Sequence, residues 1–283
     1  MDKTIKKWGT IAGAAALTFA FVDAVWLEKY FFEVNTFDIG KKGSGKKVRL
    51  LLLTDLHFRK RLYSRHYKLA NRVNELKPDL VLIAGDVVDE TGTAAPVIQF
   101  LRLLQYNIPK VAIMGNHDHK SGVSLKAYRE MYRSNNCTLL MNESKCFTIA
   151  GERVMITGLD DFIEGKASFS QAVEGVGREE NHLLLIHSPK QQETVLKQVK
   201  QMNQLRNDEE KLNLQYIFAG HNHGGQIRIF GFAPVMPEKS GHYVNGWYNA
   251  KSPYLYVSKG FGTSTLPFRF GARAELTVFD LGV

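Results

Sequence analysis

The chain has 283 residues, 44% hydrophobic and 11% aromatic, which is enough for one large globular domain plus a short appendage. Its formal net charge of +9 at pH 7 favours anionic partners such as anionic lipids or phosphorylated substrates. The sequence has no zinc-finger spacing, basic region with heptads or basic-aromatic RNA-binding signature, so we expect no specific nucleic-acid partner. Two cysteines, Cys137 and Cys146, are too few for a disulfide framework.

Residues 1–30 are predicted to be a membrane anchor or a signal segment. An apolar run from Trp8 to Leu27, interrupted only by Asp23, follows a cluster of three lysines. A run of ~20 such residues can cross a bilayer as a helix. A signal peptide cleaved at the small residues around Asp23 and a buried core helix are the alternatives. The lysines before the run favour a single N-terminal span in the cell membrane, with an extracytoplasmic domain.

Residues 31–47 are predicted to be a linker, because 40–47 are rich in Gly and Lys. The catalytic domain is expected to occupy 48–283. In its first half, apolar runs alternate with helical patterns: strands are predicted at 48–54, 80–84 and 111–114, and helices at 67–76 and 96–106. This alternation is typical of βαβ units and a parallel sheet, in which ligands bind beyond the carboxyl ends of the strands.

The second half of the domain is more mixed, and we expect its sheet to be partly antiparallel. A helix is predicted at 125–133 and a solvated helix and loop at 191–211. Strands are predicted at 138–141, 147–150, 154–157, 183–186, 216–219, 227–232, 254–258 and 275–281.

Polar motifs follow five of these strands. They are Asp55-Leu56-His57, Gly85-Asp86, Gly115-Asn116-His117-Asp118, His187 and Gly220-His221-Asn222-His223. One histidine after a strand is usually a hydrogen-bonded loop residue, but five such strand ends in one chain indicate a shared site. Mixed imidazole and carboxylate ligands suit Zn, Mn or Fe rather than Ca. Seven candidate ligands are too many for one ion and fit two ions that share a carboxylate.

This set of motifs resembles the signature of the calcineurin-like metallophosphoesterase superfamily, and the resemblance covers roughly 48–281. It implies an α/β fold, a four-layer αββα sandwich of two mixed sheets, here preceded by an N-terminal hydrophobic helix. The ending from Gly260 to Phe270 is similar to a membrane-linked bacterial branch, which includes enzymes similar to UDP-2,3-diacylglucosamine pyrophosphatase.

The resemblance also assigns roles to residues around two divalent ions. Asp55, His57 and His223 would hold the first ion, Asn116, His187 and His221 the second, and Asp86 would bridge them. The ions, whose identity as Mn, Zn or Fe stays open, would clamp a phosphoryl group and hold a hydroxide that attacks phosphorus. His117 would stand near the leaving group, with Asp118 orienting it.

The expected function is therefore a membrane-associated hydrolase of phosphoester or pyrophosphate bonds. Apolar residues in 230–270 suggest a rim for a phospholipid or nucleotide-linked lipid, with Phe268 in that rim and Arg269 clamping a phosphate. One alternative is a phosphodiesterase on nucleotides or other soluble substrates. A second alternative is that the protein is not an enzyme but a non-catalytic metal-binding interaction scaffold. The complete set of motifs argues against this alternative.

Overall fold

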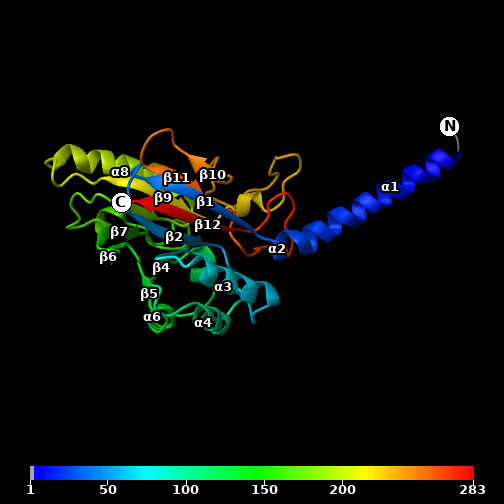
Figure 1. Ribbon diagram of the computed structural model, residues 1–283, viewed down its shortest axis with the longest axis horizontal. Coiled ribbons are helices and arrows are strands. Elements are labelled where there is room, and N and C mark those ends of the chain that lie inside the picture. Colours follow the sequence, from blue (N-terminus) through cyan, green and yellow to red (C-terminus); the bar gives the residue numbers. More distant parts are fainter. Residues whose placement is uncertain (1–2) are drawn as a thin grey trace.

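The computed structural model describes residues 3–283, which form two mixed six-stranded sheets, flanked by helices, and a long helix that projects from one end (Figure 1). The strand orders are β1-β12-β2-β3-β4-β5 and β10-β11-β9-β8-β7-β6. Alternate residues of each inner strand point to opposite faces, so Leu50 and Leu52 pack between the sheets while Leu51 and Leu53 pack under helices. This arrangement confirms the predicted four-layer sandwich.

The first sheet carries the strands of the βαβ half. Its strands are β1 (Glu33–Gly40), β2 (Lys47–Leu53), β3 (Leu80–Ala84), β4 (Lys110–Ile113), β5 (Cys137–Leu139) and β12 (Glu275–Gly282). The strands β2 to β5 run parallel, and β12 joins antiparallel to β2. Helices α3 (Ser64–Leu76), α4 (Ala94–Leu103) and α6 (Leu125–Arg133) contribute apolar residues to the core on one face of the sheet.

The second sheet is built from the later strands. They are β6 (Glu143–Ile149), β7 (Glu152–Gly158), β8 (His182–Leu185), β9 (Leu214–Ala219), β10 (Gly246–Tyr248) and β11 (Tyr254–Val257). The pairs β6–β7 and β10–β11 are antiparallel and the others parallel, as the mixed pattern predicts. Helices α7 (Phe169–Ala172) and α8 (Gln192–Leu205) pack on its outer face.

Two sequence predictions about elements are wrong. The predicted linker at 31–47 contains β1, which pairs in parallel with β12 along its whole length, so the sheet begins before residue 48. The predicted strand at 227–232 is instead a turn, in which Ile227, Ile229 and Phe232 form isolated bridges. Polar residues interrupt the apolar alternation of β1, and a left-handed Phe230-Gly231 pair breaks the second run.

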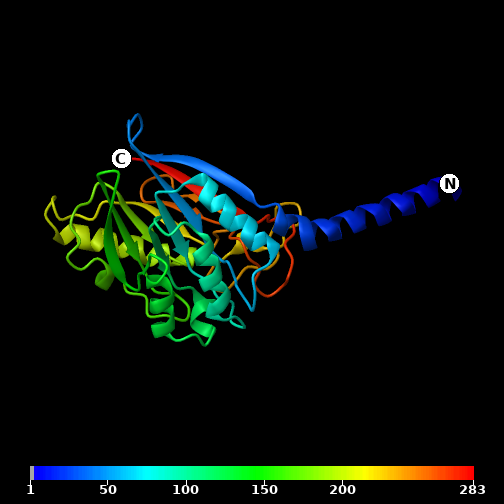
Figure 2. The ribbon, with the colours of Figure 1, turned by 60° about the horizontal axis from the view of Figure 1, so that its bottom comes forward.

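The N-terminal helix projects away from the domain (Figures 1 and 2). It comprises α1 (Lys3–Val22), a π-helical stretch (Asp23–Leu27) and α2 (Glu28–Tyr30). Its segment Lys7–Tyr30 is long and apolar enough to cross a membrane, and little of that segment is buried. A buried core helix, one of the three alternatives, is therefore not what the described residues form.

The carboxyl end of this helix is fixed to a loop formed by residues 267–272, which we call the C-terminal loop. The buried Glu28 carboxylate accepts hydrogen bonds from the backbone N–H groups of Gly271 (2.7 Å) and Ala272 (3.0 Å). The Arg269 backbone N–H donates to the Ala24 carbonyl at 3.1 Å. The helix end is therefore part of the folded domain.

Candidate active site

The five polar motifs lie at the carboxyl ends of β2, β3, β4, β8 and β9, where the two sheets meet at one edge. Five of their side chains sit on backbone in the left-handed region, with φ between 46° and 71°: Asp55, His57, Asp86, His221 and His223. Such a conformation costs of order 1 kcal/mol for a non-glycine residue and is concentrated at functional sites. Gly115 is required here, because a Cβ on it would collide with Asp86 Oδ1.

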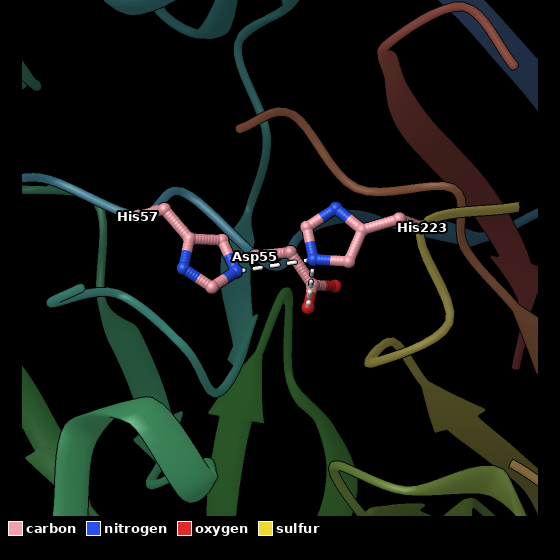
Figure 3. A group of neighbouring side chains, drawn as sticks. All are labelled: Asp55, His57 and His223. Atoms are coloured by element: carbon pink, nitrogen blue, oxygen red, sulfur yellow. Dashed lines mark hydrogen bonds and ion pairs between the residues drawn. The ribbon is translucent and has the colours of Figure 1, made fainter. Parts of the chain in front are cut away.

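The first group of donors is Asp55, His57 and His223 (Figure 3). The Nε2 atoms of His57 and His223 are 3.1 Å apart, and His223 Nε2 is 3.5 Å from Asp55 Oδ1. All three side chains are buried. Two imidazole nitrogens and a carboxylate oxygen thus converge on one point, which is the arrangement that a divalent cation requires.

The second group is Asp86, His187 and His221. His187 donates through Nδ1 to the Ala84 carbonyl at 2.8 Å, which leaves the Nε2 lone pair directed at Asp86 Oδ2, 3.2 Å away. Two acceptors that face each other in a buried site need a proton or a cation between them. The same Asp86 Oδ2 is 3.7 Å from His57 Nε2, so this carboxylate lies between the two groups.

Asn116 lines the same cavity as Asp86 and His221 of the second group. Its Oδ1 atom and His187 Nε2 are both buried without a hydrogen-bond partner among the described residues. His221 donates through Nε2 to the Glu238 carbonyl at 2.7 Å, which leaves its Nδ1 free for a ligand. The donor atoms of these residues therefore fit divalent metal ions.

The electrostatics of the site centre on Asp86. Burial raises the pKa of its carboxyl, but the neighbouring His187 and His57 outweigh burial and hold that pKa well below the ordinary value. Burial lowers the pKa of His187, but the charge of Asp86 has the larger effect and raises the pKa of His187 well above its ordinary value. Burial lowers the pKa of His223 and of His221, so these two rings are held neutral, as metal ligands must be.

One further residue, Asp89, lies behind a ligand ring, and the sequence predicted no role for it. Asp89 Oδ2 lies 3.6 Å from His57 Nδ1 and 3.3 Å from Arg59 Nε. A carboxylate behind a ligand histidine sets its tautomer and its orientation. Asp89 follows Asp86 by three residues in the same loop, but the spacing alone does not show that it reaches His57.

His117 lies at the edge of both groups. Its backbone N–H donates to Asp86 Oδ1 at 2.8 Å, and its ring packs edge-on against His57, with centroids 4.6 Å apart. Burial lowers the pKa of His117. Asp118 does not orient this ring, contrary to the prediction: its carboxylate accepts hydrogen bonds from the backbone N–H groups of Val87, Val88 and Gly115. Asp118 therefore fixes the loops that carry Asp86 and Asn116.

Arg269 does not reach substrate, so its predicted role as a phosphate clamp is wrong. The side chain is fully buried and lies behind His223, where it donates to the carbonyl of that histidine and has its Nη2 atom 3.2 Å from the ring Nδ1. It also donates to the carbonyls of Gly262, Lys259 and Ala272. Phe268 is half-buried, and its carbonyl accepts a hydrogen bond from Gln226.

A cavity of about 460 Å³ opens beside the ligand groups. Asp86, Asn116, His117 and His221 form one wall. The other walls are largely apolar and include Ile163, Ile227, Pro234, Val235, Met236 and Leu266. A concave apolar site with a few convergent polar groups is typical of ligand binding.

The comparison with known proteins agrees with this geometry. Residues 48–225 match the model of the family described as "Calcineurin-like phosphoesterase". The chain belongs to this family and is a phosphoester hydrolase of the kind that uses divalent metal ions.

Three bacterial relatives illustrate the similarity. "Uncharacterized metallophosphoesterase YkuE" of Bacillus subtilis (strain 168) is 32% identical over 74% of this chain and 70% of its own length. "Uncharacterized protein YpbG" of the same organism is 26% identical over 99% of this chain and 98% of its own. "Phosphodiesterase YaeI" of Escherichia coli (strain K12) is 27% identical over 85% and 84%.

Proposed function

We propose that the protein is a membrane-anchored hydrolase that uses two divalent ions to cleave a phosphoester or pyrophosphate bond of a lipid-linked substrate. The observation that carries this proposal is the position of Asp86, whose Oδ2 atom faces both ligand groups at the wall of a largely apolar cavity.

In this proposal each group of donors would hold one ion, and Asp86, which lies between the two groups, would contribute to both sites. The bound ions would polarise the phosphoryl group and activate water for in-line attack. His187 and His221 keep one ring nitrogen for an ion, because the other nitrogen of each donates to a backbone carbonyl. The buried carboxylates of Asp55 and Asp86 would balance part of the positive charge.

His117 is the proposed catalytic side chain that is not a ligand. Its backbone is fixed by Asp86 and its ring forms part of the cavity wall, so the ring can contact a substrate held at the ions. We assign to it the donation of a hydrogen bond or proton to the leaving oxygen, a role worth ~10²–10⁴ in rate.

The lipid part of the proposal comes from the cavity and the helix. Apolar walls next to a phosphate-binding site fit a substrate with a charged head and an apolar tail. The helix over Lys7–Tyr30 would keep this cavity near a bilayer, and the lysines that precede its apolar core favour an extracytoplasmic domain. The relative YaeI is named a phosphodiesterase, so a phosphodiester is the first bond to test.

The test compares lipid and soluble substrates with the full-length, manganese-loaded protein in lipid nanodiscs. We expect kcat/KM for a diacyl phosphodiester lipid to exceed that for its deacylated glycerol counterpart by at least tenfold. An aryl phosphodiester reports basal activity in the same preparation. Hydrolysis of nucleotide phosphodiesters with no hydrolysis of the lipid would overturn the lipid assignment and support the nucleotide phosphodiesterase alternative.

A further inference from the structure

We infer that residues 229–235, which we call the apolar loop, form a second membrane contact that inserts into the bilayer beside the N-terminal helix. This inference rests on the proposed function and deepens it, because it names the lipid surface as the partner of the same site.

The apolar loop is exposed to a degree that a soluble surface seldom shows. Phe230 is fully exposed, and Ile229, Phe232 and Val235 are exposed by 53, 71 and 76%. The sequence of the loop, Ile-Phe-Gly-Phe-Ala-Pro-Val, contains no polar side chain. A contiguous apolar patch of this kind marks a surface that contacts protein or lipid.

The backbone holds the loop in a fixed shape. Ile229 and Phe232 exchange backbone hydrogen bonds of 2.9 and 3.0 Å, which closes a two-residue turn at Phe230 and Gly231. Both turn residues have positive φ, 50° and 84°. Such turns favour Asn or Gly at the first position, so a phenylalanine there is conformationally costly. Arg228 donates to the Gly231 carbonyl and braces the turn. The turn therefore presents the Phe230 ring at its tip.

A chain of hydrogen bonds connects the apolar loop to the end of the helix. The backbone of Arg228 donates to the Phe270 carbonyl at 2.6 Å, and that of Phe270 donates to the Gln226 carbonyl at 2.9 Å. The C-terminal loop that contains Phe270 is in turn fixed to Ala24 and Glu28 of the helix. Figures 1 and 2 both place the segment after residue 225, coloured yellow to orange, next to α2, at the end of the domain from which α1 projects.

The same loop forms part of the cavity wall. Val235 and the preceding Pro234 line the cavity, together with Ile227 just before the loop. If the tip of the loop is inserted, the cavity and its metal ligands lie against the bilayer surface. A substrate could then place its phosphate at Asp86 while its acyl chains stay in the membrane. The lipid bilayer is favoured over a protein partner because the adjacent helix is itself long and apolar enough to span one.

The test places an environment-sensitive NBD fluorophore at the tip of the loop. The full chain with Cys146→Ser and Phe230→Cys is labelled and reconstituted in vesicles of phosphatidylcholine and phosphatidylglycerol, with and without doxyl-labelled lipid. Cys137 is buried and so is protected from the label. The matched control is Leu205→Cys, an apolar residue of α8 that is 90% exposed, because α8 lies on the opposite side of the domain from α1 (Figure 1).

We expect the label at residue 230 to shift to the blue and to lose at least half of its emission to doxyl lipid, while the label at 205 does neither. An equal blue shift and equal quenching of the labels at residues 230 and 205 would overturn the inference. A blue shift at 230 without quenching by lipid also overturns it, because protein, including a second copy of this chain, would then cover the loop.

A second measurement separates this inference from the proposed function. Phe230→Ser combined with Phe232→Ser should lower kcat/KM on the lipid substrate at least fivefold and leave the aryl phosphodiester unchanged. If quenching occurs at 230 but no lipid is hydrolysed, the membrane contact stands and the lipid substrate fails. If lipid is hydrolysed without quenching at 230, the substrate stands and the membrane contact fails.

Discussion

Arg269 and His223 are in direct contact behind the first group of metal donors, with Nη2 of the arginine 3.2 Å from Nδ1 of the histidine. Nη1 of Arg269 donates to the backbone carbonyl of the same histidine at 3.3 Å. Burial lowers the pKa of Arg269 to about 10, which still leaves the guanidinium charged at neutral pH. The arginine therefore fixes the backbone of one candidate ligand, and it also donates to three carbonyls of neighbouring loops.

Arg269→Lys should weaken metal binding, because lysine keeps the charge but cannot make several directed hydrogen bonds at once. Loss of a contact behind a metal ligand typically costs 10- to 100-fold in metal affinity, and we expect about tenfold here. Titration of manganese into metal-free protein measures the effect. Arg273→Lys is the control, since this half-buried residue makes none of the described side-chain hydrogen bonds. Equal affinities for the two variants would show that the contact with His223 has no effect on the site.

Truncation should separate the anchor from the fold. A chain that begins at Asp23 keeps Glu28 and β1, so we expect its thermal stability and aryl phosphodiesterase activity to stay close to those of the full chain. A chain that begins at Lys46 lacks the Glu28 carboxylate that binds Gly271 and Ala272, and it also lacks the strand that pairs with β12. We expect that chain to unfold at a lower temperature and to lose activity. Equal melting temperatures for the two truncated chains would contradict the account.

His117→Ala should leave metal content unchanged and lower kcat by about 10²–10⁴, because the proposed role belongs to the transition state. The loss should shrink for aryl phosphodiesters with more acidic leaving groups, which need less help to depart. Steady-state kinetics over a series of leaving groups measures this dependence. A loss of the same size across the whole series argues against donation to the leaving oxygen.

The stability of the fold should depend on pH through His182, a fully buried residue of β8 whose Nε2 lies 2.7 Å from Thr157 Oγ1. Burial lowers the pKa of His182 from 6.5 to about 4. As the pH falls, the unfolded chain protonates His182 before the folded chain does. The contribution of neutral His182 to the free energy of unfolding is therefore complete above pH 6.5 and is lost as the pH falls toward 4. Below pH 4 the free energy of unfolding no longer changes through this residue. The loss is about 3 kcal/mol at most. Urea unfolding at pH 7.5 and pH 5 should show a smaller pH dependence for His182→Gln than for the unchanged chain. The same pH dependence in both would show that this histidine is not the source.

Much of the site could be predicted from the sequence because each of its motifs is a short run of neighbouring residues. Each motif follows an apolar strand, and the carboxyl ends of the strands meet at one edge, so Asp55, Asp86 and His187 come together as expected. The strand β1 escaped prediction because Asn35, Thr36 and Asp38 interrupt the alternation on a strand that is only half-buried.

The roles of Arg269 and Asp118 could not be predicted, because they depend on which way a side chain points after folding. A motif places both residues near the site but does not show that Arg269 faces the back of His223 or that Asp118 binds the amides of Val87 and Val88. Both residues stabilise the loops that hold the ligands, and neither contact is encoded in residue spacing.

The count of metal ions per chain, with and without the Asp86 carboxylate, tests the central claim most directly. Elemental analysis after loading with manganese and dialysis should give close to two ions per chain for the unchanged protein. Asp86→Asn should lose most of both ions together with activity, because Asp86 Oδ2 faces His57 of one group and His187 of the other. Asp208→Asn, an exposed position, controls for the substitution itself and should keep both ions. Retention of two ions per chain by Asp86→Asn would contradict the account.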